Sequence, residues 1–166
     1  MDGVLVEYRR DVSPENIEEK LKQPGYFLNL RPEWNMIGAM RKLYNLYPDR
    51  VFILTAVYGN QYPYSIPEKI EYTNKVFPFM NNNLIIVDGD KGETKPSKIE
   101  KVLGKKIDST FFLIDDYGKN LKLWNEQGGS AVKYLNLINN NHGTVYERTL
   151  NCFMSEDEIF AQLIKY

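Results

Sequence analysis

The stretch from Phe111 to Asn120 constrains the fold most strongly, because a short apolar run leads directly into two adjacent acids. Four apolar residues bounded by turn residues indicate a strand that is buried on both faces. Asp115 and Asp116 follow at its end, and two carboxylates cannot both be ionised and dry without a partner. Open α/β sheets bind their ligands at the carboxyl ends of the strands. We therefore expect Asp115 and Asp116 to bind a hard cation, Mg²⁺, which prefers oxygen donors. The alternative is a strand-ending Asp that caps the next turn, with its neighbour in solvent.

The length of 166 residues and the composition are those of an ordinary globular protein of one domain, with room for a small insertion. The formal net charge of −1 gives no electrostatic reason to expect nucleic-acid or anionic-membrane binding. Cys152 is the only cysteine, which excludes an internal disulfide and a thiolate metal cluster. The single cysteine fits a reducing compartment, and the sequence shows neither a membrane span nor a signal-peptide pattern. We therefore expect a cytoplasmic protein.

Apolar runs that resemble strands alternate with segments of helical periodicity. The apolar runs lie at 4–6, 51–55, 84–87, 111–114 and 131–135, and the helical patterns at 14–21, 34–47, 65–76, 95–103, 120–127 and 156–164. Helix starts are indicated at Ser13, at Ser65 with capping-box spacing to Glu68, and at Ser155. The segment 136–151 is rich in loop residues. This alternation predicts an α/β fold with a mostly parallel sheet and helices on both faces.

Three further residues are candidates for the same edge of the sheet. Thr55 ends an apolar run as Asp115 does, and a hydroxyl there can bind phosphate oxygens, although an ordinary β-branched strand residue is the simpler interpretation. Lys95 precedes a helix start, where the helix dipole does not favour a cation. It is therefore expected to serve an anion or the acidic pair. The alternative is a solvated loop lysine, and Lys91 and Lys98 are close competitors. Asp2 before Gly3 has the alternative of a simple turn residue.

The ordered set of these residues resembles the haloacid dehalogenase (HAD) superfamily of phosphohydrolases. The family's motifs are an apolar strand with Asp-x-Asp-Gly, a strand ending in Thr or Ser, a Lys before a helix, and a strand ending in Asp-Asp. They are matched here by Met1–Val6 from the x onward, Phe52–Thr55, Thr94–Ser97 and Leu113–Asp116. The resemblance covers nearly the whole chain. It implies a Rossmann-like sheet with a small helical cap inserted at about residues 9–48.

Two other stretches are similar to the 5'(3')-deoxyribonucleotidase group of that superfamily. Gln23–Pro32 resembles its cap segment, and the tail resembles bacterial and phage members at Asp115–Leu121, Trp124, Gly128, Gly129, Lys133, Asn136, His142 and Gly143. The resemblance implies a small phosphate ester as substrate, a (deoxy)nucleoside monophosphate, with a homodimer left open. Tyr26 and Phe27 would stack on a base or exclude water, and Arg31 would join them at the substrate, with a purely structural cap core as the alternative.

The resemblance also assigns roles at the edge of the sheet. Asp2 would protonate the leaving alcohol and later activate water. Thr55, Ala56 and Lys95 would hold the phosphoryl oxygens, although Ala56 stands where some relatives carry a second hydroxyl. Mg²⁺ would be held by three acids: Asp2, Asp115 and Asp116.

The chain departs from the family at its first motif. The nucleophilic Asp and the apolar strand that carries it are expected immediately before Met1. In the family that strand is the middle of the sheet, so its loss would leave two inner strands with unpaired N–H and C=O groups. We therefore expect Met1 to be an internal methionine of Asp-Met-Asp-Gly, and the chain as given to be a truncated and inactive fragment. Two alternatives remain: a non-catalytic relative that binds a nucleotide or a protein, and a response-regulator-like switch. The cap-like insertion and the late acidic pair argue against the switch.

Overall fold

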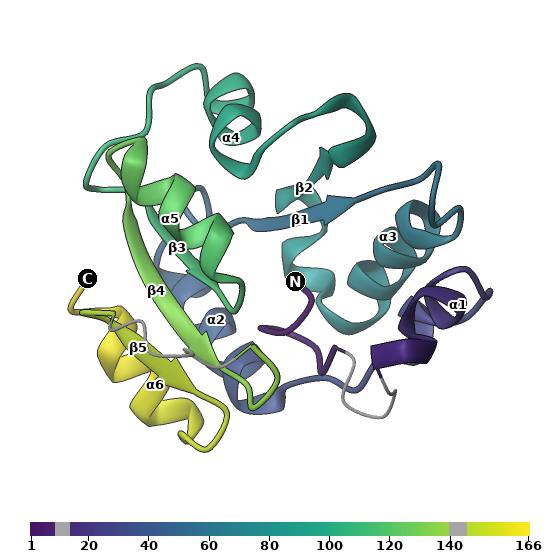
Figure 1. Ribbon diagram of the computed structural model, residues 1–166. Coiled ribbons are helices and arrows are strands. Elements are labelled where there is room, and N and C mark those ends of the chain that lie inside the picture. Colours follow the sequence, from purple (N-terminus) through teal and green to yellow (C-terminus); the bar gives the residue numbers. More distant parts are fainter. Residues whose placement is uncertain (9–13, 140–145) are drawn as a thin grey trace.

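The computed structural model describes residues 1–8, 14–139 and 146–166 as an α/β fold with parallel strands (Figure 1). The strands are β1 Ile53–Val57, β2 Leu84–Asp88, β3 Phe112–Asp115, β4 Ser130–Leu135 and β5 Thr149–Asn151. Ser13, the expected N-cap of a helix, lies outside the described residues. So do the first residues of the small inserted cap expected at about 9–48, and the tail residues His142 and Gly143.

The helices follow the periodic segments closely. They are α1 Ile17–Leu21, α2 Trp34–Leu46, α3 Ser65–Val76, α4 Lys95–Leu103, α5 Gly118–Glu126 and α6 Glu156–Leu163. Short 3₁₀ helices lie at η1 Pro14–Asn16, η2 Phe27–Asn29, η3 Pro78–Asn83 and η4 Gly89–Lys91. Gly104 ends α4 with a positive φ, and Ser155 forms the expected capping box with Glu158 at the start of α6.

The capping box predicted at Ser65 is wrong. The N-cap of α3 is Tyr64, which makes no side-chain capping bond, and the Ser65 hydroxyl is buried without a hydrogen-bond partner in the described structure. The Glu68 carboxylate accepts hydrogen bonds instead from the backbone N–H groups of Gly25 and Phe27. Glu68 therefore makes a tertiary contact with this loop, although its spacing from Ser65 predicted a capping contact at the start of α3.

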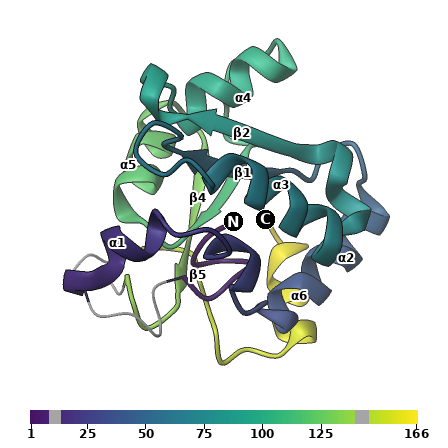
Figure 2. The ribbon, with the colours of Figure 1, turned by 90° about the vertical axis from the view of Figure 1, so that its right-hand side faces the viewer.

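Two hydrophobic cores cover opposite faces of the strands. Ile53 and Ile114 pack into the core that contains α2, α3 and α6, whereas their neighbours Leu54 and Leu113 pack into the core of α4 and α5. Successive strand residues point to opposite faces, so this alternation places helices on both sides. Figure 2 shows α4 on one side of the strands and α2 and α6 on the other.

The strands form two separate parallel sheets within the described residues, not the single sheet that the sequence predicts. β1 pairs with β2, and β4 lies between β3 and β5. β5 was missed by the sequence analysis, which placed its three residues in a loop-rich segment. The edge of the first sheet at β1 faces the edge of the second sheet at β3, and no described strand lies between these two edges.

Candidate functional site

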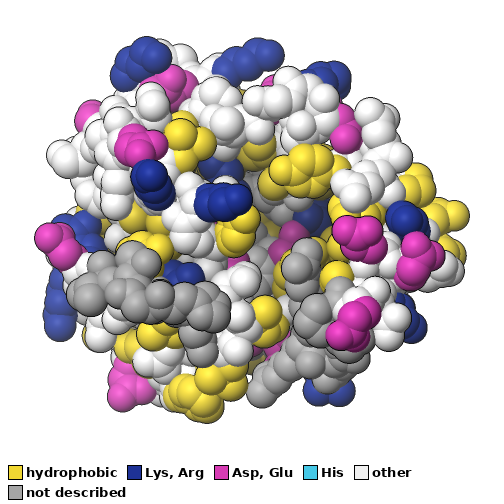
Figure 3. All heavy atoms as spheres, viewed as in Figure 1, with side chains coloured by type: hydrophobic (Ala, Val, Ile, Leu, Met, Phe, Trp, Pro, Cys, Tyr) yellow, Lys and Arg dark blue, Asp and Glu magenta, His cyan; other side chains and the backbone are white. Residues whose placement is uncertain are grey.

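The predicted site residues gather around Met1, whose position near the middle of the molecule is marked in Figure 1. Met1 is buried, and the charges of Lys95, Asp2, Asp115 and Lys69 all act at this point. The same face is hollowed at its centre in Figure 3, where acidic side chains are visible at the bottom. We use the term rim for the predicted site residues Asp2, Thr55, Lys95, Asp115 and Asp116, together with the side chains that contact them.

Lys95 and Asp115 form a buried ion pair in the rim. Nζ of Lys95 donates to Oδ2 of Asp115 at 2.5 Å, and the two side chains are only 10% and 4% exposed. Oδ2 of Asp115 also accepts from the Asn120 amide, and Oδ1 accepts from the backbone N–H of Tyr117. Pro96 at the helix start and the Thr94–Ser97 capping box fix the first turn of α4, which places Lys95 over the end of β3.

Asp116 has a different set of partners. Its Oδ2 accepts hydrogen bonds from the amides of Asn136 at 2.8 Å and Asn139 at 2.6 Å. A Cβ atom at Gly3 would collide with the Asp116 carboxylate, and Gly3 has a φ of +73°, so the turn after Asp2 needs a glycine for both reasons. The backbone carbonyl of Asp116 accepts from the buried Lys133.

The pKa values of these two adjacent acids shift in opposite directions. Burial alone would raise the pKa of Asp115, but the charge and hydrogen bond of Lys95 outweigh burial and hold that pKa below its usual range. Burial raises the pKa of Asp116, and the negative charge of Asp115 adds to the shift, which the two asparagines only partly offset. Two neighbouring carboxylates therefore have different electrostatic roles, one neutralised by a lysine and one left short of positive charge.

Lys69 is a rim residue that the sequence analysis missed. Its side chain is 3% exposed, and its Nζ donates to Asp2 Oδ2 at 2.5 Å, to the Thr55 hydroxyl at 3.3 Å and to the Ala56 carbonyl at 2.8 Å. Lys69 thus joins three residues that were predicted separately. Lys69 shares the buried face of α3 with Ser65, Tyr72 and Thr73, and because this face is largely polar, no apolar periodicity in the sequence marked it.

The three cap residues that were predicted to contact the substrate differ in how deeply they are buried. Phe27 is 2% exposed, and Lys69 Nζ lies 5.0 Å from the centre of its ring. Tyr26 is half-buried and meets Phe27 edge-on, whereas Arg31 is exposed and its carbonyl accepts from Glu7 N–H. Glu68 holds the loop from the neighbouring position to Lys69. The loop is therefore tied to the rim through Phe27, which leaves the base-stacking role of Tyr26 and Arg31 a prediction.

The fit of the rim to Mg²⁺ rests on its carboxylate oxygens. Oδ1 of Asp2 is buried and lacks a hydrogen-bond partner among the described residues. A carboxylate oxygen in this state is suited to bind a cation. Asp116 is short of positive charge, whereas Asp115 is already satisfied by Lys95, Asn120 and Tyr117. Asp2 and Asp116 therefore fit a cation directly, and Asp115 would have to release a hydrogen bond. Over the described ranges, no three acidic, histidine or cysteine side chains stand close enough to count as a preformed metal cluster.

Comparison with known proteins gives no family assignment, since neither a protein-family model nor a curated protein matches the chain. In the described parts of the chain, no helix is both long and apolar enough to cross a membrane.

Proposed function

We propose that the rim is the phosphate and Mg²⁺ site of a HAD-type phosphomonoester hydrolase that acts on (deoxy)nucleoside monophosphates. The observation that supports the proposal is the convergence of Asp2, Thr55, Lys95, Asp115 and Asp116 around one buried point, from segments far apart in the sequence.

The chemistry of the rim suits a phosphate dianion. Lys69, Lys95 and the Thr55 hydroxyl supply donors for phosphoryl oxygens, and Asp2 and Asp116 supply oxygens for a cation. Phosphoryl transfer depends mainly on positioning and charge neutralisation, and Mg²⁺ would supply the additional positive charge when bound. Asp2, whose Oδ2 accepts a hydrogen bond from Lys69, would act as the acid and base toward the leaving alcohol and water.

The finer fold assignment belongs to the same proposal. The parallel strands, the helices on both faces, and the loop that Glu68 fastens to α3 support a Rossmann-like HAD arrangement with a small cap at about 9–48. The HAD resemblance places the attacking carboxylate two positions before Asp2. We therefore expect the 166-residue chain to bind a phosphate ester with Mg²⁺ without hydrolysing it.

Binding can be tested on the chain as it is. Calorimetric titration should show binding of a deoxynucleoside monophosphate that requires Mg²⁺, and no binding of the corresponding nucleoside. Asp116→Asn should weaken the Mg²⁺-dependent binding at least about tenfold, because a neutral amide attracts the cation less. Asp157→Asn is the matched control, since its carboxylate is 88% exposed on α6. Equal binding by the two variants would contradict the proposed site.

Hydrolysis needs a second experiment, in which an apolar segment ending in Asp is placed before Met1. We expect phosphate release from deoxynucleoside monophosphates with Mg²⁺, and none when that Asp is replaced by Asn. Absence of release over a panel of phosphomonoesters would reject the hydrolase. If Mg²⁺-dependent binding nevertheless persisted, the alternative of a non-catalytic nucleotide-binding relative would replace it.

A further inference from the structure

Tyr58 is an exposed aromatic residue that follows β1 directly and contributes nothing to the rim itself. β1 ends at Val57, so Tyr58 lies three residues beyond Thr55. At a rise of about 3.3 Å per strand residue, its backbone stands about 10 Å further out than that of Thr55. The Tyr58 side chain is 47% exposed, and within the described residues it has neither a hydrogen-bond partner nor an aromatic one. It is therefore free to contact a ligand.

The Tyr58 ring lies against Gly89, the first residue after β2. A Cβ atom at Gly89 would collide with this ring, so the close approach depends on a residue without a side chain. The backbone N–H of Asn60 donates to Oδ2 of Asp90 at 2.8 Å, which ties the same two loops together. The ring is thus supported from one side and open to solvent on the other. A ring held in this way loses little conformational entropy when a ligand stacks on it.

The open ring stands at the same edge of the strands as the rim. Ala56, two residues before Tyr58, accepts a hydrogen bond from Lys69 through its carbonyl. Lys95 begins α4, which packs on β1 and β2. Figure 3 shows apolar side chains beside the central hollow, at whose bottom the acids lie. An aromatic group at this edge is therefore close to where a phosphate in the rim would be held.

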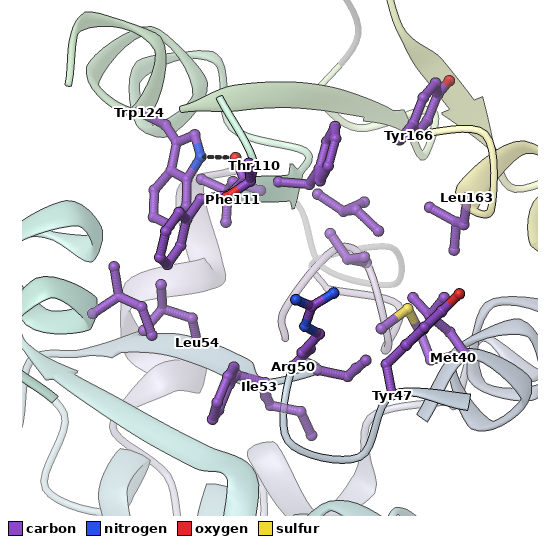
Figure 4. Close-up of a pocket in the computed structure, with 18 of the residues that line it drawn as sticks. Met40, Tyr47, Arg50, Ile53, Leu54, Thr110, Phe111, Trp124, Leu163 and Tyr166 are labelled. Carbon is purple, nitrogen blue, oxygen red and sulfur yellow. Dashed lines mark hydrogen bonds between the residues drawn. The ribbon is translucent and has the colours of Figure 1, made fainter. Parts of the chain in front are cut away.

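The opposite direction from the rim leads into the molecule. A cavity of about 880 Å³ lies there between β1 and β3, and its lining ends at Leu54 and Ile114, directly before the rim (Figure 4). Met1 also lines it, and the HAD resemblance expects the strand that precedes Met1 in this place. We therefore assign this cavity to no ligand. The part of a phosphate ester that extends beyond its phosphate has to point outward, past the end of β1.

The aromatic residues of the cap offer less open surface than Tyr58. Phe27 is 2% exposed, and Nζ of Lys69 lies 5.0 Å from the centre of its ring. Tyr26 is half-buried, and its ring meets those of Phe27 and Tyr8 edge-on. Stacking needs an accessible ring face, so Tyr58 is the better platform for a planar group.

We propose that the rim selects phosphate monoesters that carry a planar aromatic group, and that this group stacks on Tyr58. The inference rests on the proposed function, which supplies the phosphate site, and adds the residue that distinguishes one ester from another. A nucleobase meets the requirement, because every base has a flat π face, whereas a sugar phosphate lacks one.

The test compares two ligands that share a phosphate and a sugar, deoxythymidine 5'-monophosphate and 2-deoxyribose 5-phosphate. Calorimetric titration of the 166-residue chain with Mg²⁺ should show at least about tenfold tighter binding of the nucleotide. Tyr58→Ala should lower the affinity for the nucleotide to that for the sugar phosphate. Tyr58→Phe should keep the preference, because the ring stacks without its hydroxyl.

A second variant displaces the ring without removing it. In Gly89→Ala the added Cβ meets the far end of the Tyr58 side chain, which can move, so the fold is retained while the ring leaves its seat. The preference for the nucleotide should fall here too. Tyr47→Ala is the matched control, since Tyr47 is 46% exposed at the C-cap of α2. It should keep the preference, and circular dichroism confirms that each variant is folded.

The possible failures can be told apart. Equal binding of the two ligands by the wild type, or an equal loss of both in Tyr58→Ala, would overturn the inference alone. So would loss of the preference in Tyr117→Ala but not in Tyr58→Ala, because Tyr117 is the exposed tyrosine that follows Asp116. Absence of Mg²⁺-dependent binding of both ligands would overturn the proposed function, and the inference with it.

Discussion

The two halves of the molecule contribute opposite chemistry to the rim. The β1–β2 half, with α3 and α4 packed on it, provides the cations Lys69 and Lys95 and the Thr55 hydroxyl. The β3–β4–β5 half provides two carboxylates, Asp115 and Asp116, and the amides that hold them. One half is thus suited to a phosphate and the other to a metal ion, so neither half forms the proposed site alone.

The halves share the two hydrophobic cores, and at the rim they are also joined by polar bridges. Lys95 of α4 pairs with Asp115 at the end of β3. The N-terminal turn provides the second bridge: Asp2 pairs with Lys69, and the Gly3 carbonyl accepts from Asn136 after β4. The charges that we propose to position a substrate therefore also join the two halves. Breaking the bridges one at a time tests this idea.

Lys95→Met should have the largest effect. It leaves the Asp115 carboxylate buried without its cation, and removal of one partner from a buried ion pair typically costs about 3–5 kcal/mol. We expect the free energy of unfolding, measured by urea denaturation, to fall by that amount.

The control for Lys95→Met is Lys101→Met, which changes an exposed lysine of the same helix and should stay within about 0.5 kcal/mol of the wild type. Adding Asp115→Asn to Lys95→Met should recover part of the loss, because the uncompensated charge disappears. A loss below about 1 kcal/mol for Lys95→Met would mean that this pair does not join the halves.

Lys69→Met should have a smaller effect, about 2 kcal/mol in the same measurement. The side chain of its partner Asp2 is 19% exposed, so water can replace part of the lost interaction, whereas the Ala56 carbonyl and the Thr55 hydroxyl lose a buried donor. Lys75→Met, at an exposed position of α3, is the control. A cost equal to that of Lys95→Met would show that the two bridges are equivalent.

The sequence was sufficient to predict the parts of the rim that sit on strands. Asp115 ends β3 and Asp116 follows it, as expected from the rule that ligands lie at the carboxyl ends of parallel strands. Thr55 was expected to end its strand as well, but β1 continues to Val57. Lys95 could be added because its place at a helix start was otherwise unexplained. Each of these predictions depends on local pattern together with one rule of topology.

The residues that were missed are defined by tertiary contacts. Lys69 lies within a helix, and Asn139 lies in a segment without periodicity, so spacing gave neither of them a role. Glu68 shows the same difficulty in reverse, since its spacing to Ser65 suggested a cap while its carboxylate holds a loop more than forty residues away in sequence. The break between the two sheets does not follow from local patterns, but unpaired inner strands were expected from the resemblance, because its middle strand lies ahead of Met1.

Asp116→Asn should have the smallest effect on stability, and in the opposite direction. The raised pKa means that the folded state binds the Asp116 proton more tightly than the unfolded state does, so the ionised carboxylate costs stability above its folded pKa. In EDTA at pH 7, we expect Asp116→Asn to increase the free energy of unfolding by no more than about 1 kcal/mol. This gain should disappear as the pH falls toward the ordinary carboxyl value of 3.8, because the wild-type group is then protonated in the folded state.

Asp115→Asn is the contrasting variant to Asp116→Asn. The pKa of Asp115 is lowered, so its contribution to stability is present above the ordinary value of 3.8 and is lost as the pH falls through its folded pKa. It should therefore destabilise the protein at pH 7, where Asp116→Asn does not. Added Mg²⁺ should stabilise the wild type and leave Asp116→Asn unchanged, since only a ligand bound by the folded state shifts the unfolding equilibrium. Destabilisation by both variants in EDTA would show that the two acids share one structural role. The distinction between Asp115, which pairs with a lysine, and Asp116, which is proposed to bind a cation, would then be wrong.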